Sequence, residues 1–153
     1  KHSRDQKGGV VAPTIGTQGK ANLYLRYGAA IDEDTTWKLS AQGRYAEPSN
    51  FLASGAEAED RLSNATVDAR FDRKIGNGSD LALWANATNS SLGDALNIAF
   101  ANTLPLTLQP VSIKQTNNSQ TLGGRYRWLT AGGIESSVQT SFQASSLALG
   151  HFY

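Results

Sequence analysis

The sequence predicts an all-β fold, an antiparallel up-and-down meander of about seven to eight strands that forms a transmembrane β-barrel or a segment of one. Three observations support this fold class. Apolar and polar residues alternate with a period of two, helical periodicity is hard to find, and tight turns alternate with long connections. The 153 residues suffice for one domain.

Seven segments carry the alternation. In each, a row of Leu, Val, Ala, Tyr, Trp or Phe residues faces away from a row of polar and charged residues. The segment 79–89 is less regular, because Trp84 shares the polar parity with Asn86. The segments are 9–16, 21–31, 36–46, 62–74, 79–89, 119–130 and 133–145.

The connections favour a membrane barrel over a soluble sheet, whose strands would alternate in the same way. The turns "IDEDTT", "IGNGSD" and "TAGG" are short and rich in Gly, Asn and Asp, as hairpin turns require. Long loops are predicted at 47–61 and 90–118. In a meander, alternate connections lie at the same end, so the short turns gather at one end and the long loops at the other. Outer-membrane barrels have this asymmetry, although the short connection "TQGK" falls at the long-loop end.

Aromatic residues on the apolar parity form two rows. Trp37, Phe71 and Trp128 lie near the short turns, and Tyr45 and Phe142 lie toward the long loops. Two such rows are typical of the aromatic girdles that border a lipid-facing band. The apolar parity is therefore predicted to face lipid, and the polar parity to face a lumen.

Composition narrows the functional classes. Lys plus Arg (14) nearly balances Asp plus Glu (13), so nothing indicates a partner nucleic acid. The absence of cysteine removes disulfides and thiolate chemistry. No apolar run is long enough for a transmembrane helix, and no apolar segment of a signal peptide follows the first charges. Because methionine is absent even at position 1, we expect a processed product or a piece of a longer protein.

Five stretches occur in a distinctive order. They are "GGVV" at 8–11, "YLRYGAAIDED" at 24–34, "KLSAQGRYAE" at 38–47, "ATVDARFDRKIGNGSDLALWANAT" at 65–88 and "TLGGRYRWLTAGGIESSVQTSFQAS" at 121–145. The first four resemble the early barrel strands of TonB-dependent outer-membrane receptors. The last resembles the strand pair that follows the third large loop of these receptors.

The resemblance implies a bacterial outer-membrane transporter. Receptors of this family are barrels of about 22 strands filled by an N-terminal plug, and they import a siderophore, cobalamin or a similar nutrient with energy delivered by TonB. This chain departs from them, because it has no recognisable plug or TonB box and too few strands to enclose such a lumen. Residues 1–8 would then be the lead-in from a plug domain, and residues 9–153 a barrel segment in contact with outer-membrane lipid.

Polar-parity residues form two candidate groups. Those nearer the short turns would contact the plug or pair with one another across the lumen. They are Lys38, Asp68, Arg70, Asp72, Arg125, Arg127 and Glu135. Those nearer the long loops would meet a small nutrient ligand, and are Arg44, Asn64, Thr66, Asn86 and Thr88, with Phe51 from the first loop. Leu52, Ile98 and Phe100 would close over that ligand or pack the loops.

No motif indicates catalysis, a metal or a cofactor. His2 and His151 lie at the chain termini, where a catalytic or metal site would have to be built from tails. The turn "IDED" lacks the ligand spacing of an EF-hand, and "GNGSD" lacks the lysine of a phosphate-binding loop. We therefore expect no enzyme activity.

Two other architectures are compatible with the sequence. One is a complete small outer-membrane barrel of about eight strands, with residues 147–153 as the closing strand, whose inward polar groups would need a packed hydrogen-bond network. The other is a soluble secreted β-sandwich that binds carbohydrate or protein. It would bury the apolar face in a core and expose Arg44 and Arg125, whose charges would then contribute little.

Overall fold

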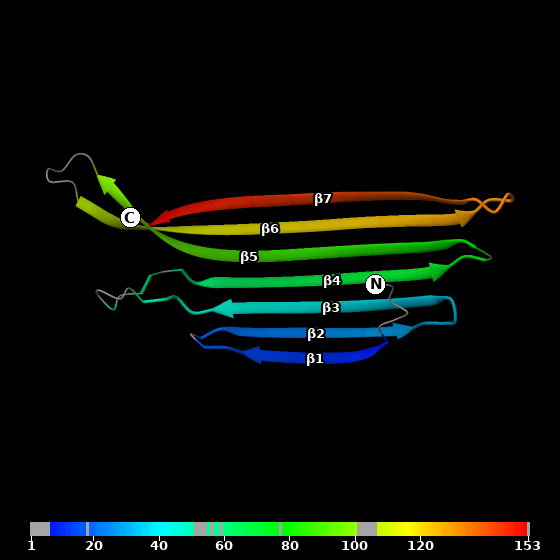
Figure 1. Cartoon of the computed structure of the whole chain (residues 1–153), viewed down its shortest axis with the longest axis horizontal. Coiled ribbons are helices and arrows are strands. Elements are labelled where there is room, and N and C mark those ends of the chain that lie inside the picture. Colours follow the sequence, from blue (N-terminus) through cyan, green and yellow to red (C-terminus); the bar gives the residue numbers. More distant parts are fainter. Residues whose placement is uncertain are drawn as a thin grey trace.

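Seven antiparallel strands in a single sheet make up the computed structural model of the chain (Figure 1). The strands are β1 (Gly8–Ile15), β2 (Ala21–Ala30), β3 (Thr35–Ala46), β4 (Leu62–Lys74), β5 (Asp80–Phe100), β6 (Thr107–Leu129) and β7 (Glu135–Phe152). The structure describes residues 7–17, 19–50, 55, 57–58, 60–76, 78–100 and 107–152, with backbone only for 95–100, 107–110, 112 and 151–152. The described part contains no helix, and so none that could cross a membrane.

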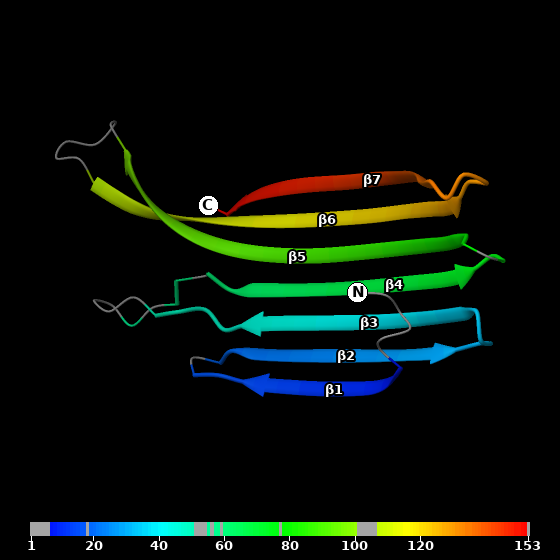
Figure 2. The same ribbon diagram turned by 45° about the vertical axis from the view of Figure 1, so that its right-hand side comes forward.

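Each strand pairs with its neighbours in the sequence, in the order β1 to β7. The predicted all-β meander is thus confirmed, as an open sheet with two free edges (Figure 2). Every predicted strand is present, but the last three are longer than predicted. The predicted loop at 90–118 is wrong for most of its length, because β5 continues to Phe100 and β6 begins at Thr107. The segment 147–152 extends β7 and does not form an eighth strand.

The short turns are fixed by residues with special backbone properties. At the β2–β3 turn, Oδ1 of Asp32 accepts hydrogen bonds from the backbone N–H groups of Asp34 at 2.9 Å and Thr35 at 2.6 Å, which closes an Asx turn. At the β4–β5 turn, Gly78 has a φ of 84°. A Cβ there would also lie 2.9 Å from the Cβ of Leu129, so two independent constraints select glycine.

The register places the predicted apolar parity on one face of the sheet, here called the apolar face. Leu39, for example, is paired with Tyr27 on one side and Ala69 on the other, and Leu122 is paired with Ala85 and Phe142. The opposite surface, here called the polar face, carries the charged and amide residues. Residues directly opposite one another in a ladder share a face. The faces assigned to the residues of one strand therefore determine the faces of the residues in every other strand.

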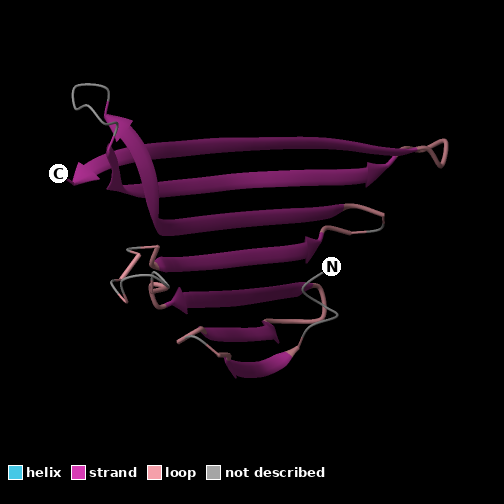
Figure 3. Cartoon of the chain, turned by 60° about the vertical axis from the view of Figure 1, so that its left-hand side comes forward, coloured by secondary structure: helices cyan, strands magenta, loops and turns pink. Residues whose placement is uncertain are grey.

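No described element covers either face (Figure 3). Among the described hydrophobic residues only Ala58 and Ala82 are buried. Large side chains of the apolar face are open, with Leu25 39% and Phe142 71% exposed. Tyr24 and Arg26 of the polar face are more covered than the apolar residues Leu23 and Leu25 beside them. A sheet with this distribution has no core of its own and requires a second apolar layer.

The apolar residues form a band that is limited along the strands. Toward the long-loop ends, the same face becomes polar at the aligned residues Asn89, Asn118 and Ser146. The polar face changes in the opposite sense near this level, where it carries Leu62, Leu92, Leu147 and Leu149. The two faces therefore exchange polarity along β4 to β7.

The limit of the band toward the long loops, here called the upper limit, runs obliquely across the strands. On β3 it lies at Tyr45. On β7 it lies at Phe142, which the ladders align with Leu122, Ala85, Ala69 and Leu39. From β3 to β7, which are four strand intervals apart, the upper limit therefore shifts toward the short turns by six residues, the distance from Tyr45 to Leu39 along β3.

The limit toward the short turns, here called the lower limit, also shifts toward the short turns from β3 to β6. On β3 it lies at Trp37, which aligns with Phe71, Leu83 and Gly124. On β6 it lies at Trp128, four residues beyond Gly124 and three strand intervals from β3. Aromatic rings pair along this limit, Tyr27 with Trp37 at 5.7 Å and Tyr126 with Trp128 at 5.5 Å between centroids.

Candidate functional site

The polar face is the candidate functional surface, and the ladders divide it into rows. Nearest the short turns are charged rows. One of them contains Lys74, Asp80 and Arg127, and the next contains Asp72 and Arg125. Farther along lies a neutral row of amides and hydroxyls, Gln42, Thr66, Thr88, Ser119 and Ser145. Beyond it are the leucines of the exchanged region, so charged, neutral polar and apolar rows follow one another from turns to loops.

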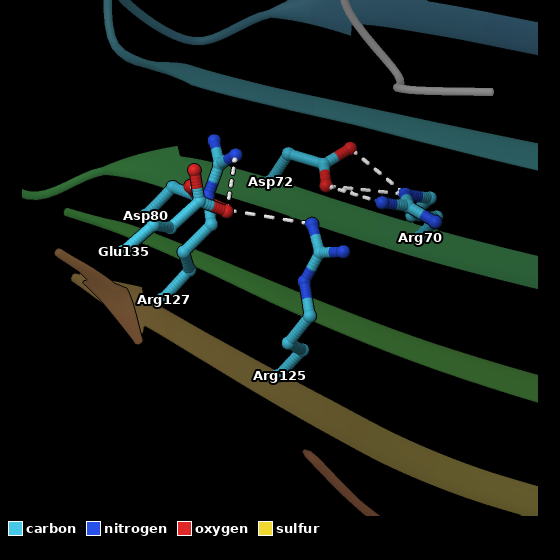
Figure 4. Close-up of polar contacts among 6 residues, drawn as sticks. All are labelled: Arg70, Asp72, Asp80, Arg125, Arg127 and Glu135. Carbon is cyan, nitrogen blue, oxygen red and sulfur yellow. Dashed lines mark hydrogen bonds and ion pairs between the residues drawn. The ribbon is translucent and has the colours of Figure 1, made fainter. Parts of the chain in front are cut away.

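Arg70 and Asp72 form the first ion pair of the charged rows (Figure 4). They are two residues apart on β4, and therefore share a face. Arg70 donates from Nε to Oδ2 of Asp72 at 2.9 Å and from Nη2 to Oδ1 at 2.8 Å. This bidentate geometry is the strong form of the guanidinium–carboxylate bond, and the Asp72 side chain is only 10% exposed.

Asp80 is the centre of the second cluster, between two arginines of β6 (Figure 4). Its Oδ1 accepts a hydrogen bond from Nε of Arg127, and its Oδ2 lies 3.6 Å from Nη2 of Arg125. Arg127 also donates from Nη1 to Oε1 of Glu135 at 3.3 Å. Arg127 is directly opposite Asp80 in the ladder, and Arg125 lies two residues away on the same face. One carboxylate of β5 thus holds two guanidinium groups of the neighbouring strand β6.

The charged rows keep unused hydrogen-bonding capacity. Among the described side chains, Nε of Arg125 and Nε of Arg26 are buried without a hydrogen-bond partner. A buried donor without a partner is costly unless water or another group satisfies it. Both nitrogens are covered by surrounding atoms of the chain itself, so each is a local cost of the polar face.

The amides and hydroxyls of the polar face form a hydrogen-bonded ladder that includes the carboxylate of Asp68. Nδ2 of Asn86 donates to Oδ1 of Asp68 at 2.7 Å, and the hydroxyls of Thr66 and Thr88 lie 3.2 Å apart. Oγ1 of Thr66 also lies 3.4 Å from Oδ1 of Asn64. Hydroxyl and amide groups can both donate and accept, so this part of the polar face can exchange its internal bonds for bonds to water or a ligand.

Trp84 is a large aromatic residue within the polar face. It lies directly opposite Gly123 on β6 and Arg70 on β4. A Cβ at Gly123 would overlap the indole ring, so the ring occupies the space that a side chain would need. The aromatic therefore covers the glycine of the neighbouring strand, an arrangement that stabilises β-sheets.

The long connection between β3 and β4 is fastened at its base by Asp60. Oδ1 of Asp60 accepts from the backbone N–H of Ser49 at 2.5 Å, and Oδ2 accepts from its hydroxyl at 2.7 Å. The backbone N–H of Ala58 donates to the carbonyl of Ser49 at 2.7 Å. The two bonds from Ser49 lower the pKa of Asp60 below its usual 3.8. The hydrogen bonds from Thr35 and Asp34 lower the pKa of Asp32 below the same value.

The sequence-predicted residues lie on the polar face as their parity requires. Arg44, Asn64, Thr66, Asn86 and Thr88 occupy three neighbouring strands near the middle. Asp68 lies level with Asn86, and closer to the short turns lie Lys38, Arg70, Asp72, Arg125, Arg127 and Glu135. Phe51 and Leu52 lie outside the described residues, as do the side chains of Ile98 and Phe100.

Sequence reasoning missed Asp80 and Gly123. Asp80 reads as the last residue of a polar turn, and its role depends on its alignment with Arg127. Gly123 reads as one of two neighbouring glycines, and only the pairing with Trp84 explains it. A search for opposite charges at equal distances from a hairpin turn would not have found Asp80, because β5 and β6 are not joined by a short turn.

The described residues offer no group of three or more His, Cys, Asp or Glu side chains that could hold a metal ion. Shallow hollows of about 420, 310 and 450 Å³ lie mainly on the apolar face, where small residues such as Ala69, Ala85 and Gly43 separate larger ones. The chemistry of the polar face is therefore that of ion pairing and hydrogen bonding.

No protein-family model matches the chain, and neither the curated proteins nor the solved structures include a match.

Proposed function

We propose that the chain is part of the wall of an outer-membrane β-barrel, with its apolar face in lipid and its polar face toward a lumen. The barrel belongs, in this proposal, to a nutrient transporter of the TonB-dependent receptor kind. The oblique apolar band carries the first part of the proposal. The resemblance of the sequence to the early strands of such receptors carries the second.

The slope of the band agrees with the strand tilt of membrane barrels. Its limits fall six residues over four strand intervals at the top and four residues over three at the bottom. With about 3.4 Å per residue and about 4.8 Å between strands, both slopes correspond to strands tilted by about 45°. Outer-membrane barrels have tilts of about 35–45°. A band that is level in the membrane must cross tilted strands at such an angle, whereas the core of a soluble sheet has no such requirement.

The uncovered apolar face also favours lipid. Burying a Leu, Val or Phe side chain fully contributes about 1.5–3 kcal/mol. The band leaves a large part of each such side chain open, as at Leu39 and Val67. Acyl chains would fill the shallow hollows between them and cover the band without a second protein layer.

In the proposed transporter, the polar face has two tasks. The charged rows near the short turns, including Asp72 and Asp80, would contact the plug domain. The neutral rows nearer the loops, with Asn64 and Thr88, would contact a siderophore, cobalamin or a similar nutrient during import. TonB would deliver the energy through the plug, and the wall itself would catalyse no reaction.

A charge placed in the band tests the membrane part of the proposal. Leu83 lies in the middle of the band on β5, and Ser91 lies on the same face and strand beyond the band. Leu83→Arg should destabilise the folded barrel by about 2–4 kcal/mol and Ser91→Arg by about 0–1 kcal/mol. Urea unfolding in lipid vesicles, followed by tryptophan fluorescence, measures both.

The contrary results are equally definite. A chain that is folded and monodisperse in buffer without detergent, with equal effects of the two arginines, would exclude a lipid-facing band and favour a soluble binding module.

For the transport part, deletion of the gene should slow growth when ferric siderophore or cobalamin is the limiting supply. Loss of TonB should have the same effect, and unchanged growth on every such nutrient would contradict import.

A further inference from the structure

Arg44 is an arginine of the polar face that lies among neutral groups. Its direct ladder neighbours are Asn22 on β2 and Asn64 on β4. No acidic residue lies within two positions of these three residues along the chain. Arg70, in the charged rows, differs because it is paired with Asp72. The charge of Arg44 is therefore not neutralised by a carboxylate within the described part of the chain.

The guanidinium group of Arg44 is held along one edge by a neutral side chain. With its amide oxygen turned toward Arg44, Gln42 accepts hydrogen bonds from Nε at 3.1 Å and from Nη2 at 3.2 Å. No described group accepts a hydrogen bond from Nη1, and Arg44 is exposed. A guanidinium group has five N–H donors and can bind a carboxylate through two parallel bonds. The edge formed by Nη1 and Nη2 is therefore available to an oxyanion.

An apolar region of the polar face begins one step beyond Arg44 toward the long loops. Leu62 is diagonal to Arg44 across the β3–β4 ladder, and Leu92 lies directly opposite Leu62. Diagonal neighbours are about 7–8 Å apart, and directly opposite residues are about 5 Å apart. Leu149 lies farther along the same row. Leu92 is 45% and Leu149 61% exposed, so the apolar region is open beside an available cation.

Lipid would not cover these leucines in the proposed barrel. They lie on the polar face, whereas the outward side at the same level carries Ser91 and Thr116. Exposed apolar area is unfavourable in water, and a contiguous apolar patch marks a surface that a ligand or another chain covers. The occupant of this surface has to bring apolar atoms to Leu62 and Leu92 and negative charge to Arg44, one step away.

We propose that this part of the polar face binds a small amphiphilic anion. A carboxylate or similar oxyanion of the ligand would lie on Arg44, and its apolar chain or ring would lie on Leu62 and Leu92. The inference rests on the proposed function and narrows the imported nutrient to this chemical class. The side-chain amides of Asn22 and Asn64 flank the anion and can donate to the oxygens that the guanidinium group leaves free. A polar ligand would leave the leucines uncovered, and a neutral apolar ligand would leave the guanidinium group without an anion.

Binding of hexanoate to the full-length protein in lipid nanodiscs tests this inference, with acetate and hexanol as matched probes. Amide chemical shifts of Asn64 and Leu92 follow each titration, and nanodiscs without protein give the amount of each probe that lipid takes up. Each methylene group that the leucines cover should strengthen binding about two- to fourfold. Hexanoate should therefore bind at least about 10-fold more tightly than acetate.

Hexanol has the chain of hexanoate but no charge for Arg44. Because hydrogen bonds between ionised groups are the strong ones, hexanoate should also bind about 10-fold more tightly than hexanol. Equal affinity for hexanoate and acetate would overturn the inference, since it would show that the leucines do not contact the ligand, as when a loop of the chain covers them. Equal affinity for hexanoate and hexanol would overturn it as well, since the cation would then play no part.

Two variants separate the contact with the charge from the contact with the chain. Arg44→Gln should weaken hexanoate binding about 10-fold and leave hexanol binding unchanged. Leu92→Ser should reduce the preference for hexanoate over acetate at least about threefold and leave acetate binding unchanged. Both residues are exposed, so the sheet should still fold.

Lys114→Gln is the matched control. It removes a cation that lies directly opposite Gly93, the residue after Leu92, on the outward side of the sheet. This variant should leave all three affinities within about twofold. An effect as large as that of Arg44→Gln would overturn the inference, because the charge of the whole chain, and not Arg44, would then attract the anion.

The result can be separated from the test of the membrane proposal. If Leu83→Arg is more destabilising than Ser91→Arg but hexanoate binds no more tightly than acetate, this inference fails and the membrane proposal stands. If the two arginines have equal effects, the membrane proposal fails, and with it the identification of the bound anion as an imported nutrient.

Discussion

Gly123 and Trp84 show how one residue can depend on its cross-strand neighbour. The indole ring occupies the position that a Cβ at Gly123 would take. Gly123→Ala should therefore destabilise the folded state by about 1–3 kcal/mol through overpacking. Gly43→Ala is the control, because a Cβ there meets nothing within 4 Å. Unfolding in denaturant, monitored by circular dichroism, measures the difference, and equal stability of the two variants would show that the ring moves aside freely.

Asp80 should matter more than any other acid of its cluster. Asp80→Asn leaves Arg125 and Arg127 close together without their shared anion, and should cost about 1–3 kcal/mol of unfolding free energy. Glu135→Gln removes an exposed partner, whose side chain is 62% exposed, and should cost less than about 1 kcal/mol. Measuring the unfolding free energy of the two variants in the same denaturant experiment shows which acid stabilises the cluster more. A larger effect for Glu135 would show that Asp80 does not organise the cluster.

The bond between Asp60 and Ser49 should depend on pH. Hydrogen bonds to the carboxylate lower the pKa of Asp60 in the folded state, so its contribution to stability is complete above the unfolded value near 3.8. That contribution disappears as pH falls through the lower folded value. The amide resonance of Ser49 should therefore titrate with a midpoint below 3.8, and Asp60→Ala should abolish the titration. A midpoint at or above 3.8 would contradict the bond.

Parity was sufficient to place the candidate residues on one face, but not to pair them. The alternation of β4 alone puts Arg70 and Asp72 side by side, and the structure joins them. The partners of Asp80 are different, because they depend on the register between β5 and β6, and a long hairpin lies between those strands. Local periodicity determines which way a side chain points, whereas contacts across strands depend on the ladder.

At the scale of the element, the sequence was informative where one face was apolar. The strands β2, β3 and β4 were predicted almost to their observed ends, because an apolar row makes the period of two visible. The far part of the β5–β6 hairpin was missed. Around Asn89 and Asn118 both faces are polar, so the alternation disappears although the backbone hydrogen bonds continue.

The turns were predictable for a local reason. Asp32 supplies its own acceptor to the backbone, and Gly78 supplies a positive φ, so each signal lies within a few residues. The connection at 47–61 was also expected. The hydrogen bonds between Asp60 and Ser49 join residues eleven positions apart, and no sequence pattern predicts such a bond.

At the scale of the whole molecule, the sheet has the surfaces of a wall without a core. Seven strands lie in one layer, and most of the exposed large apolar side chains are on its apolar face. The alternation predicted two faces of different polarity, and the structure has them. Closure could not be predicted, because it depends on what pairs with β1 and β7.

In the proposed barrel, the exchange of polarity between the faces would determine which residues the cell exposes to its surroundings. In the proposed orientation, β5, β6 and β7 continue past the lipid, and their outward side carries Asn118, Thr116 and Lys114. This side would be the part of the wall that antibodies and bacteriophages meet on an intact cell. Its residues would point away from the proposed lumen, so variants that escape such recognition would accumulate there without altering the proposed route of a nutrient.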